Sequence, residues 1–259
     1  ENGGMTHGDL GGDRTNEPSP GGAGEPAGDD GLATRLSDIA RSLQEEDSAQ
    51  DTLQAIVDAA VGTVPGAELA GISLIEGRQK VRTPAATDPT VEAVDQAQYE
   101  TGEGPCLDAL YEHRTIRLPD MAAEARWPKF TARIAGLGVH SMLSFQLFVA
   151  GDNLGALNLY ARTENAFDDE SDHIGLLFAS HAAVALAGAQ REEQLVAGMH
   201  TRDLIGQAKG ILMERYKLTG DQAFALLIRS SQTLNVKLRE VAEELTRSGE
   251  IRGVSRRRE

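Results

Sequence analysis

Cysteine and aromatic residues are scarce in this sequence of 259 residues. It has one cysteine, Cys106, and 4% of its residues are aromatic. A single thiol excludes an intramolecular disulfide framework and any zinc site built from several thiolates, and it is typical of proteins in a reducing compartment. The sequence therefore favours a cytoplasmic protein that folds without disulfides.

Long apolar runs are missing as well. The most apolar stretch, IGLLFASHAAVALAGA from Ile174, is interrupted by Ser180 and His181. It is shorter than the roughly 20 residues that a membrane-spanning helix needs. The first residues do not resemble a secretory signal, which has a basic start and an apolar centre. We therefore expect no membrane contact.

Acidic residues outnumber basic ones in the whole chain, but the balance differs between its two parts. The formal net charge is −15, from 25 Lys and Arg against 40 Asp and Glu. From Glu193 onward, however, there are 12 Lys and Arg against 9 Asp and Glu, whereas the first 192 residues hold 13 against 31. Nucleic-acid binding draws most of its affinity from attraction between cations and phosphates. Such a partner is therefore disfavoured for the first part of the chain and compatible with the last.

The pattern of apolar residues divides the chain into segments. Residues 1–31 contain ten glycines and three prolines, and Leu10 is their only Leu, Ile, Val or Phe. We expect this segment to be disordered, because it cannot bury enough surface to offset chain entropy. Apolar residues at helical spacing then predict two helices, with stripes at 32–43 and 53–64. Ser48 is placed to cap the second helix.

Strands are predicted where the period changes from helical to alternating. The expected elements are strands at 67–75, 80–86 and 114–118, a turn at 77–79, helical structure at 88–111 broken by TGEGP, a helix at 128–138 and a hairpin at 141–161 turned by GDN. Two helices followed by strands interleaved with helices indicate an α+β fold with a mostly antiparallel sheet and flanking helices.

The last third of the sequence is predicted to be helical. No proline follows Asp168, so one long helix, or two nearly continuous ones, could join the sheet domain to the C-terminal helices. Thr219 and Gln222 form a capping box that opens a further helix, and Asn235 is predicted to cap the last one. The apolar repeat of the long helix is an imperfect heptad, so its pairing in a homodimer is a hypothesis.

The stretch LIGQAKGILMERY, residues 204–216, raises the main functional question. Its apolar residues share one helical face, and beside that face runs a stripe formed by Arg202, Gly206, Lys209 and Met213. Each glycine inside a helix costs about 1 kcal/mol relative to alanine. One interpretation is steric, since small residues four positions apart let two helices approach closely. The other is a basic, thinly covered surface for a nucleic acid.

The C-terminal sequence TRDLIGQAKGILMERYKLTGDQAFALLIRSSQTLNVKLREVAEEL resembles the ANTAR domain, a three-helix RNA-binding antitermination module. The matching positions are Arg202, Ile205, Ala208, Lys209, Gly210, Leu212, Met213, Ala223, Leu227, Lys237, Leu238, Val241 and Ala242. Residues 191–249 are accordingly assigned to this domain, and residues 250–259 to a basic, flexible tail.

Residues 32–190 are similar to a GAF domain, the fold of a family of small-molecule sensors. The likeness rests on GEGPCLDAL and on the hairpin VAGDNLGALNLYA. A GAF domain followed by an ANTAR domain is the arrangement of a group of actinobacterial regulators. The resemblance implies that a signal received by the first domain controls the second. It leaves the ligand and any cofactor unknown.

The ANTAR resemblance implies binding to paired RNA hairpins in nascent transcripts, so that a competing terminator does not form. Recognition of RNA needs hydrogen-bonding and cationic groups near unpaired bases and phosphates. The candidate RNA-binding residues are therefore Arg202, Gly206, Gln207, Lys209, Gly210, Arg229, Asn235 and Lys237. Asn235 has the alternative role of a helix cap, and Arg229 and Lys237 that of a solvated helix face.

Two other functions fit parts of the sequence. A DNA-binding regulator is one, because the helices of 219–245 are joined tightly enough to mimic a helix-turn-helix, although Glu240, Glu243 and Glu244 would repel DNA phosphates. An enzyme such as a methionine sulfoxide reductase is the other, but that chemistry relies on more thiols than Cys106. A redox or chromophore-attachment role for Cys106 competes with that of a buried structural cysteine. We expect no catalytic residues and no metal site.

Overall fold

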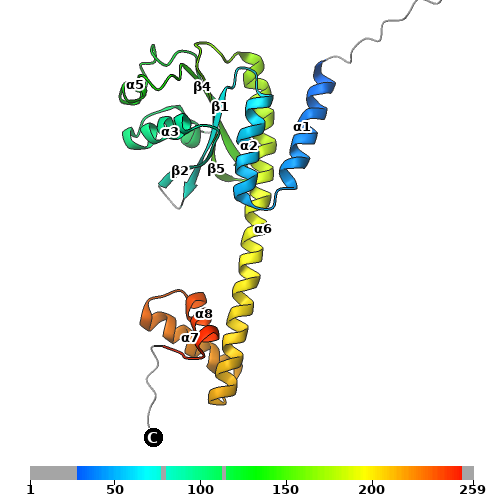
Figure 1. Ribbon diagram of the computed structural model, residues 1–259, viewed down its shortest axis with the longest axis vertical. Coiled ribbons are helices and arrows are strands. Elements are labelled where there is room, and N and C mark those ends of the chain that lie inside the picture. Colours follow the sequence, from blue (N-terminus) through cyan, green and yellow to red (C-terminus); the bar gives the residue numbers. More distant parts are fainter. Residues whose placement is uncertain (1–27, 77–79, 113–114, 253–259) are drawn as a thin grey trace, which may run out of the picture.

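The computed structural model describes residues 28–76, 80–112 and 115–252, and it consists of two bodies joined by one long helix (Figure 1). Its elements in chain order are α1 (Gly28–Gln44), α2 (Ala49–Thr63), β1 (Leu69–Glu76), β2 (Lys80–Ala86), α3 (Pro89–Thr101), α4 (Pro105–Glu112), β3 (Ile116–Leu118), α5 (Pro128–Ile134), β4 (Ser141–Val149), β5 (Asp152–Ala161), α6 (Asp169–Tyr216), α7 (Gly220–Leu234) and α8 (Leu238–Ser248). The predicted α+β fold with an antiparallel sheet is confirmed.

The N-terminal helix is longer than predicted. Helix α1 begins at Gly28, within the segment predicted to be disordered, and its inward residues Leu36 and Leu43 are buried in the core. Outside the described residues lie the rest of that segment, 1–27, the predicted turn at 77–79 and most of the predicted tail, 253–259. The cap of α2 is as predicted, because the Asp51 N–H donates to Ser48 Oγ over 3.1 Å.

The sheet has the strand order β2-β1-β5-β4-β3, and every neighbouring pair is antiparallel. The predicted β4–β5 hairpin is confirmed, but its turn is shorter than GDN. Ala150 and Gly151 form it, with φ values of 51° and 98°, and Asp152 already pairs with Val149. Two-residue hairpin turns of this kind need positive φ at both positions. The turn is therefore set by the strand register and not by Asp152 and Asn153.

The two faces of the sheet are covered by different helices (Figure 1). One face is apolar, with buried residues such as Ile72, Phe145 and Leu157, and it packs against α2 and α6, on which α1 rests. The other face is covered by α3 and α4 and has a second apolar cluster around Met142 and Tyr160. We call this part, from α1 to the first half of α6, the sensor body.

Helix α6 is a single helix of 48 residues, which confirms the predicted continuous connection. Its start is fixed by a capping box in which the Ser171 N–H donates to Asp168 Oδ1 over 2.9 Å. The first half of the helix packs on the sheet, and the last turns pack against α7 and α8. The core of this C-terminal bundle consists of Ala208, Leu212, Ala223, Leu227, Val241, Ala242 and Leu245.

Helix α6 is also long and apolar enough to cross a membrane by length and composition, with a mean hydropathy of 1.2 in its most apolar window. That window is 44% buried inside the protein, where residues such as Phe178 and Ala182 pack on the sheet. Core helices of soluble proteins satisfy the same criterion. Packing within the sensor body therefore accounts for the buried part of this stretch.

Candidate functional site

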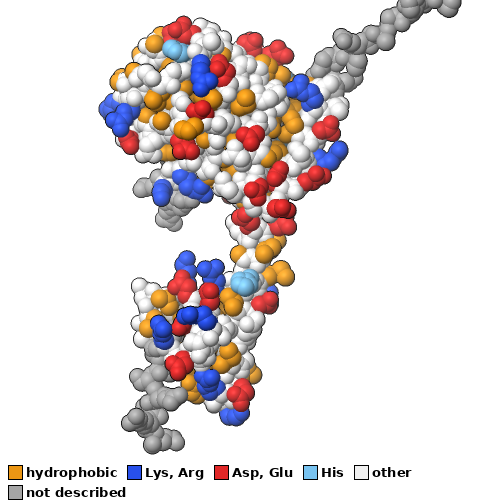
Figure 2. Space-filling model, in the orientation of Figure 1, with side chains coloured by type: hydrophobic (Ala, Val, Ile, Leu, Met, Phe, Trp, Pro, Cys, Tyr) orange, Lys and Arg blue, Asp and Glu red, His pale blue; other side chains and the backbone are white. Residues whose placement is uncertain are grey.

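The basic stripe predicted on the C-terminal helix lies at the surface of the bundle. Arg202, Gly206 and Gly210 are exposed, and Lys209 is half-buried, whereas Ala208 on the inner side of the same helix is fully buried. The stripe and the core are therefore on different faces of α6, as the helical period predicts. Figure 2 shows Lys and Arg side chains spread over this bundle and interspersed with acidic ones.

Gly206 of the stripe and Gly210 beside it contact no other helix. A Cβ atom built on Gly206 or on Gly210 would meet nothing within 4 Å. Close packing against another helix, the steric interpretation of these glycines, therefore has no counterpart within the described chain. The glycines leave a strip of helix backbone without side-chain cover, which a partner can approach.

Lys209 is held at the junction of α6 and α7. Its Nζ lies 5.8 Å from the centre of the Phe224 ring, and an added Cβ on Gly220 would lie 3.7 Å from the same Nζ. A cation over an aromatic face gains about 0.5 to 1 kcal/mol at exposed sites. The ammonium group is therefore oriented by α7 while it stays within reach of solvent.

The other predicted residues are exposed but are not gathered around Lys209. Gln207 lies two residues before Lys209 on α6, which amounts to about 200° around the helix. Its side chain therefore projects away from that of Lys209. Arg229 lies on the outer side of α7, opposite the buried Leu227. Lys237 occupies the N-cap position of α8, where its side chain makes no capping hydrogen bond. Their part in RNA binding stays a prediction.

The predicted capping role of Asn235 is wrong. Asn235 does not begin α8 but ends α7 in the left-handed region, with φ 53° and ψ 41°, and its N–H donates to the Ser231 carbonyl. Val236 N–H donates to the same carbonyl over 3.1 Å. Helices commonly end in such a left-handed residue, and asparagine tolerates that conformation better than most residues. The tight connection leaves Lys237 at the N-cap instead.

Some cations of the bundle have structural partners. The Arg215 guanidinium donates to the Gly249 carbonyl, and ion pairs join Lys217 to Glu214 and both Arg247 and Arg252 to Glu244. Within the described part of the chain, no ion pair involves Arg202, Lys209, Arg229 or Lys237. These cations are therefore free to neutralise phosphates.

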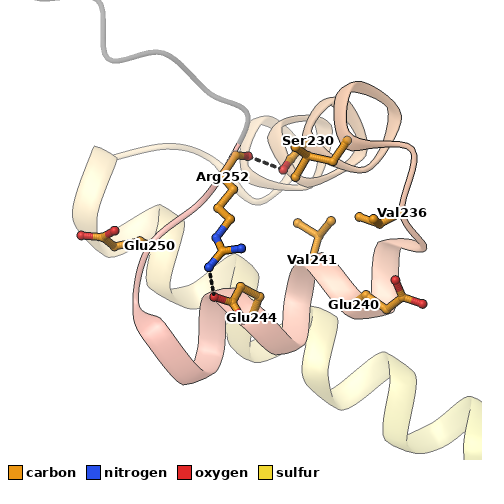
Figure 3. A pocket seen from close by; sticks show the side chains of 8 residues that line it. Ser230, Val236, Glu240, Val241, Glu244, Glu250 and Arg252 are labelled. Carbon is orange, nitrogen blue, oxygen red and sulfur yellow. Dashed lines mark hydrogen bonds and ion pairs between the residues drawn. The ribbon is translucent and has the colours of Figure 1, made fainter.

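A pocket between α7, α8 and the chain that follows them has a different character (Figure 3). Its floor includes Val236 and Val241, and its rim carries acidic side chains. Glu244 pairs with Arg252 at 3.1 Å, and the Arg252 carbonyl accepts a hydrogen bond from Ser230 Oγ at 2.5 Å. The start of the predicted flexible tail is thus attached to the bundle. The acidic rim, which includes Glu240, makes this face unsuitable for phosphate.

Inside the sensor body lies a group of polar side chains that the sequence did not single out. We call it the buried polar cluster, and it consists of Ser73, Thr83, Asp95, Gln98, Tyr99, Cys106, Asn158 and Tyr160. It lies between the sheet and the helices α3 and α4. Asp95 is at its centre and is fully buried.

The carboxylate of Asp95 collects hydrogen bonds from several elements. Tyr160 Oη on β5 donates to Oδ1, and Thr83 Oγ1 on β2 donates to Oδ2 over 2.7 Å. Ser73 Oγ and Asn158 Nδ2 contribute longer contacts of 3.3 Å and 3.4 Å. Burial raises the pKa of Asp95 above its ordinary value, although these hydrogen bonds oppose the rise. The cluster therefore favours a neutral carboxyl group.

Cys106 belongs to the same cluster. Its side chain is fully buried and its Sγ donates to Ser73 Oγ over 3.1 Å. Burial, aided by the charge of Asp95, raises the pKa of the Cys106 thiol to about 12. The thiolate is the reactive form of cysteine, so this thiol is poorly suited to nucleophilic or redox chemistry.

Two buried polar atoms next to the cluster have no hydrogen-bond partner among the described residues. They are Ser144 Oγ on β4 and Asn158 Oδ1 on β5, and the two residues are directly paired across the strands. Buried polar atoms are normally satisfied by protein, water or ligand. A buried water or a small polar molecule would complete the hydrogen bonding of these two oxygens.

One sequence signal could have revealed the buried polar cluster. Asp95 and Gln98 continue the inward stripe of Val91 and Val94 in α3, and Asn158 stands between Leu157 and Leu159 in β5. Polar residues at inward positions of regular elements are unusual and point to a shared function. The cluster also depends on the strand register that places β1 between β2 and β5, which the sequence does not reveal.

Comparison with protein families divides the chain in the same way as the structure. The model of the GAF domain matches residues 46–187, which is more than half of the chain, and the model of the ANTAR domain matches residues 193–245. No curated protein matches the chain.

Solved structures resemble this chain at low sequence identity. The GAF domain of a phosphoenolpyruvate-protein phosphotransferase from Coxiella burnetii is 16% identical, with a TM-score of 0.50, over 63% of this chain and 96% of that chain. The phytochrome photosensory core module of Stigmatella aurantiaca is 12% identical, with a TM-score of 0.55, over 82% of this chain and 46% of that chain. Free methionine-R-sulfoxide reductase from Neisseria meningitidis is 14% identical, with a TM-score of 0.48, over 62% of this chain and 91% of that chain.

These likenesses show the fold alone, and the two family matches cover both bodies of the molecule. The stripe on α6 lies inside the ANTAR match, and the buried polar cluster lies inside the GAF match. The chain therefore belongs to the GAF domain family and carries a C-terminal ANTAR domain, which is the architecture of a GAF and ANTAR domain-containing regulator.

Proposed function

We propose that the protein is a transcription antitermination regulator that binds paired RNA hairpins through the C-terminal bundle. The observation that carries the proposal is the exposed stripe of α6, in which Arg202 and Lys209 flank helix backbone left bare at Gly206. Phosphate groups need cations, and closely approaching RNA needs room beside the helix. The ANTAR match adds the family's association with RNA and antitermination.

The bundle is less suited to duplex DNA, the alternative target. A helix-turn-helix reads DNA by inserting its second helix into the major groove. Here that helix would be α8, where Glu240 and Glu243 are exposed and Glu244 is half-buried. The charges of Glu240 and Glu243 would repel the phosphates on both sides of the groove. The basic stripe lies on α6, outside the pair of helices that mimics this motif.

We also propose that the protein acts in the cytoplasm, as a homodimer, and not as an enzyme. The exposed apolar side chains of Leu195, Val196 and Met199 on α6 support pairing with a second copy. The burial and raised pKa of the Cys106 thiol speak against a thiol-based reaction. A regulator needs only two states that differ in RNA affinity.

The signal received by the sensor body is, in this proposal, a small polar molecule bound beside the buried polar cluster. The unsatisfied oxygens of Ser144 and Asn158 support it. A ligand that binds the folded state raises its stability by mass action. Such a ligand should raise the melting temperature of the wild-type protein but not that of Asn158→Leu; an equal rise in both would place its binding elsewhere.

The experiment that tests RNA binding is a titration of the whole chain with a dual-hairpin RNA, a matched single hairpin and duplex DNA, each at two salt concentrations. We expect the tightest binding to the dual hairpin, with affinity falling steeply as salt rises. Equal, weak binding to all three would contradict the proposal.

Substitution of the stripe sharpens the same titration. Arg202→Ala and Lys209→Ala should each weaken RNA binding about tenfold and reduce the salt dependence by about one phosphate contact. Arg239→Ala, which removes an exposed cation from α8, is the matched control. Unfolding curves should show unchanged stability of the bundle; a large loss of stability would assign Arg202 and Lys209 a structural role.

A further inference from the structure

The pocket between α7, α8 and the end of the described chain has apolar side chains that the bundle leaves uncovered. Leu234 and Val236 line it and are exposed by 40% and 37%, whereas Val241 between the two helices is buried. The pocket has a volume of about 180 Å³. Burial of such apolar surface under an aliphatic side chain lowers the free energy. The pocket therefore favours an apolar occupant.

The rim of the same pocket carries carboxylates that lack cationic partners. Glu240 and Glu250 are exposed, and neither forms an ion pair within the part of the chain that the structure describes. Glu244, in contrast, is paired with both Arg247 and Arg252. Attraction between opposite charges is stronger beside apolar surface than in bulk water. An occupant with an aliphatic side chain and a nearby cation would therefore fit both the floor and the rim.

The described chain ends at the wall of this pocket and is attached there. Ile251 packs against the core of the bundle. The Arg252 guanidinium pairs with Glu244 at 3.1 Å, and its carbonyl accepts from Ser230 Oγ at 2.5 Å (Figure 3). Residues 253–259, GVSRRRE, follow in the sequence and lie outside the described residues. We call them the terminal segment. Because its first residue is tied to the pocket wall, this segment has a high effective concentration at the pocket.

The terminal segment has the pattern of side chains that the pocket favours. In an extended chain, side chains two positions apart project to the same side. Val254 and Arg256 would then share the side on which Arg252 meets the bundle, whereas Ser255 and Arg257 would project away from it. An extended segment thus presents a cation, an aliphatic side chain and a second cation in a row.

The pocket presents the complementary groups in the same order. In Figure 3, Val241 on the floor lies between Arg252, with its partner Glu244, and Glu240 on the far rim. Val236 extends the apolar floor toward the same end. The order of carboxylate, apolar floor and carboxylate therefore matches the order of side chains in an extended terminal segment.

We propose that the terminal segment docks in the pocket of its own bundle, with Val254 on the apolar floor and Arg256 on Glu240, and that docking withholds its arginines from other anions. Four extended residues reach at most about 14 Å, more than the roughly 8 to 10 Å between the axes of packed helices. A free run of arginines binds any polyanion through phosphate contacts. Docking would therefore reduce unspecific binding of nucleic acid, and it does not depend on the proposed RNA function.

Disulfide trapping in the full-length chain tests the docking. In Val254→Cys combined with Val236→Cys, oxidation should join the two thiols within one chain. Ser255→Cys combined with Val236→Cys is the matched control, because position 255 has the same reach but projects away from the floor. Peptide mapping identifies the bond, and denaturing electrophoresis shows whether it lies within one chain. Equal trapping in both variants, or none at position 254, overturns the docking. Covalent dimers would assign the pocket to a second copy and overturn docking within one bundle.

Binding of a random-sequence duplex DNA tests the withholding of the arginines. Glu240→Gln removes the carboxylate proposed to hold Arg256 and should raise the affinity for this probe about threefold. Glu243→Gln is the matched control for the loss of one negative charge, since Glu243 is exposed on the same helix but does not line the pocket. Circular dichroism checks the fold of both.

Deletion of residues 253–259 completes the experiment. In the shortened chain, Glu240→Gln should raise the affinity for duplex DNA no more than Glu243→Gln does, because no arginines remain to be released. The excess seen in the full-length chain is then the coupling between Glu240 and the terminal segment. Equal effects of the two substitutions in the full-length chain, or an excess that persists after the deletion, would overturn the withholding.

Discussion

The sensor body and the C-terminal bundle place their polar side chains in opposite ways. In the sensor body, Asp95 and Asn158 are fully buried beneath α3 and α4, where Asn158 Nδ2 donates to Asp95 Oδ1 and Asn158 Oδ1 has no partner among the described residues. In the bundle, Arg202 and Lys209 lie at the surface of a small apolar core. Buried polar groups are costly unless every one is paired, whereas exposed cations cost the fold little. Substitutions should therefore affect mainly stability in the first body and mainly binding in the second.

The largest effect is expected from Asp95→Ala. The substitution removes the acceptor of the Tyr160 and Thr83 hydroxyl groups and leaves several buried donors unpaired. Each unsatisfied group costs about 1 to 3 kcal/mol, so the sensor body should lose on the order of 3 kcal/mol or more. Asp95→Asn is the control. Its amide oxygen accepts as before and its NH₂ donates to hydroxyl groups that rotate, so most of the stability should remain.

Chemical denaturation monitored by the fluorescence of Trp127, which is buried in the sensor body, measures this difference. Amide hydrogen exchange in α7 and α8, which lie in the bundle, should not change in either variant. Similar stabilities of Asp95→Ala and wild type would mean that the buried polar cluster does not hold the sensor body together.

The pH dependence of the sensor body should be the next largest effect. Because burial raises the pKa of Asp95, the folded state keeps its proton at pH values where the unfolded chain has lost it. The stabilising contribution of Asp95 is fully present below the pKa that this group has in the unfolded chain. It is lost as pH rises through the raised pKa of the folded state, by up to about 1.4 kcal/mol per pH unit.

The free energy of unfolding, measured from pH 4 upward for wild type and Asp95→Asn, isolates this contribution. Carboxylates with lowered pKa values, such as Asp168 at the start of α6, change stability in the opposite direction and are common to both proteins. The difference between wild type and variant should therefore decline with rising pH. A difference that is constant with pH would contradict a raised pKa of Asp95.

The contrast between the bodies also explains what the sequence could and could not predict. In the bundle, period and capping patterns predicted the helices, the Thr219 cap and the exposure of the stripe, because each depends on neighbours within a few residues. The buried polar cluster depends on strand register, which brings Ser73 within 3.0 Å of Asn158, and no local pattern reports such a distance. Asn235 was misassigned because asparagine suits both ends of a helix, and only the backbone conformation decides between them.

Replacing Gly206 of the stripe or the neighbouring Gly210 should change stability and binding in opposite directions. Gly206→Ala and Gly210→Ala meet open space, so each should stabilise the bundle by about 0.5 to 1 kcal/mol through helix propensity. If RNA approaches the bare backbone, the added methyl groups should nevertheless weaken RNA binding. Gly62→Ala in α2, which also meets nothing within 4 Å, is the control that gains stability without losing affinity. Unchanged RNA affinity in both α6 variants would mean that the glycines have no part in RNA binding.

Asn235→Gly should have the smallest effect. Asn235 ends α7 in the left-handed region, and glycine adopts that conformation without strain, so the stability of the bundle should change by less than about 0.5 kcal/mol. Glycine also removes the side chain that was a candidate RNA contact. The substitution therefore separates the two roles of this residue, which denaturation and RNA titration measure independently. Wild-type RNA affinity would leave Asn235 with the structural role alone, and a clear loss of affinity at constant stability would add its amide to the surface that the basic stripe provides.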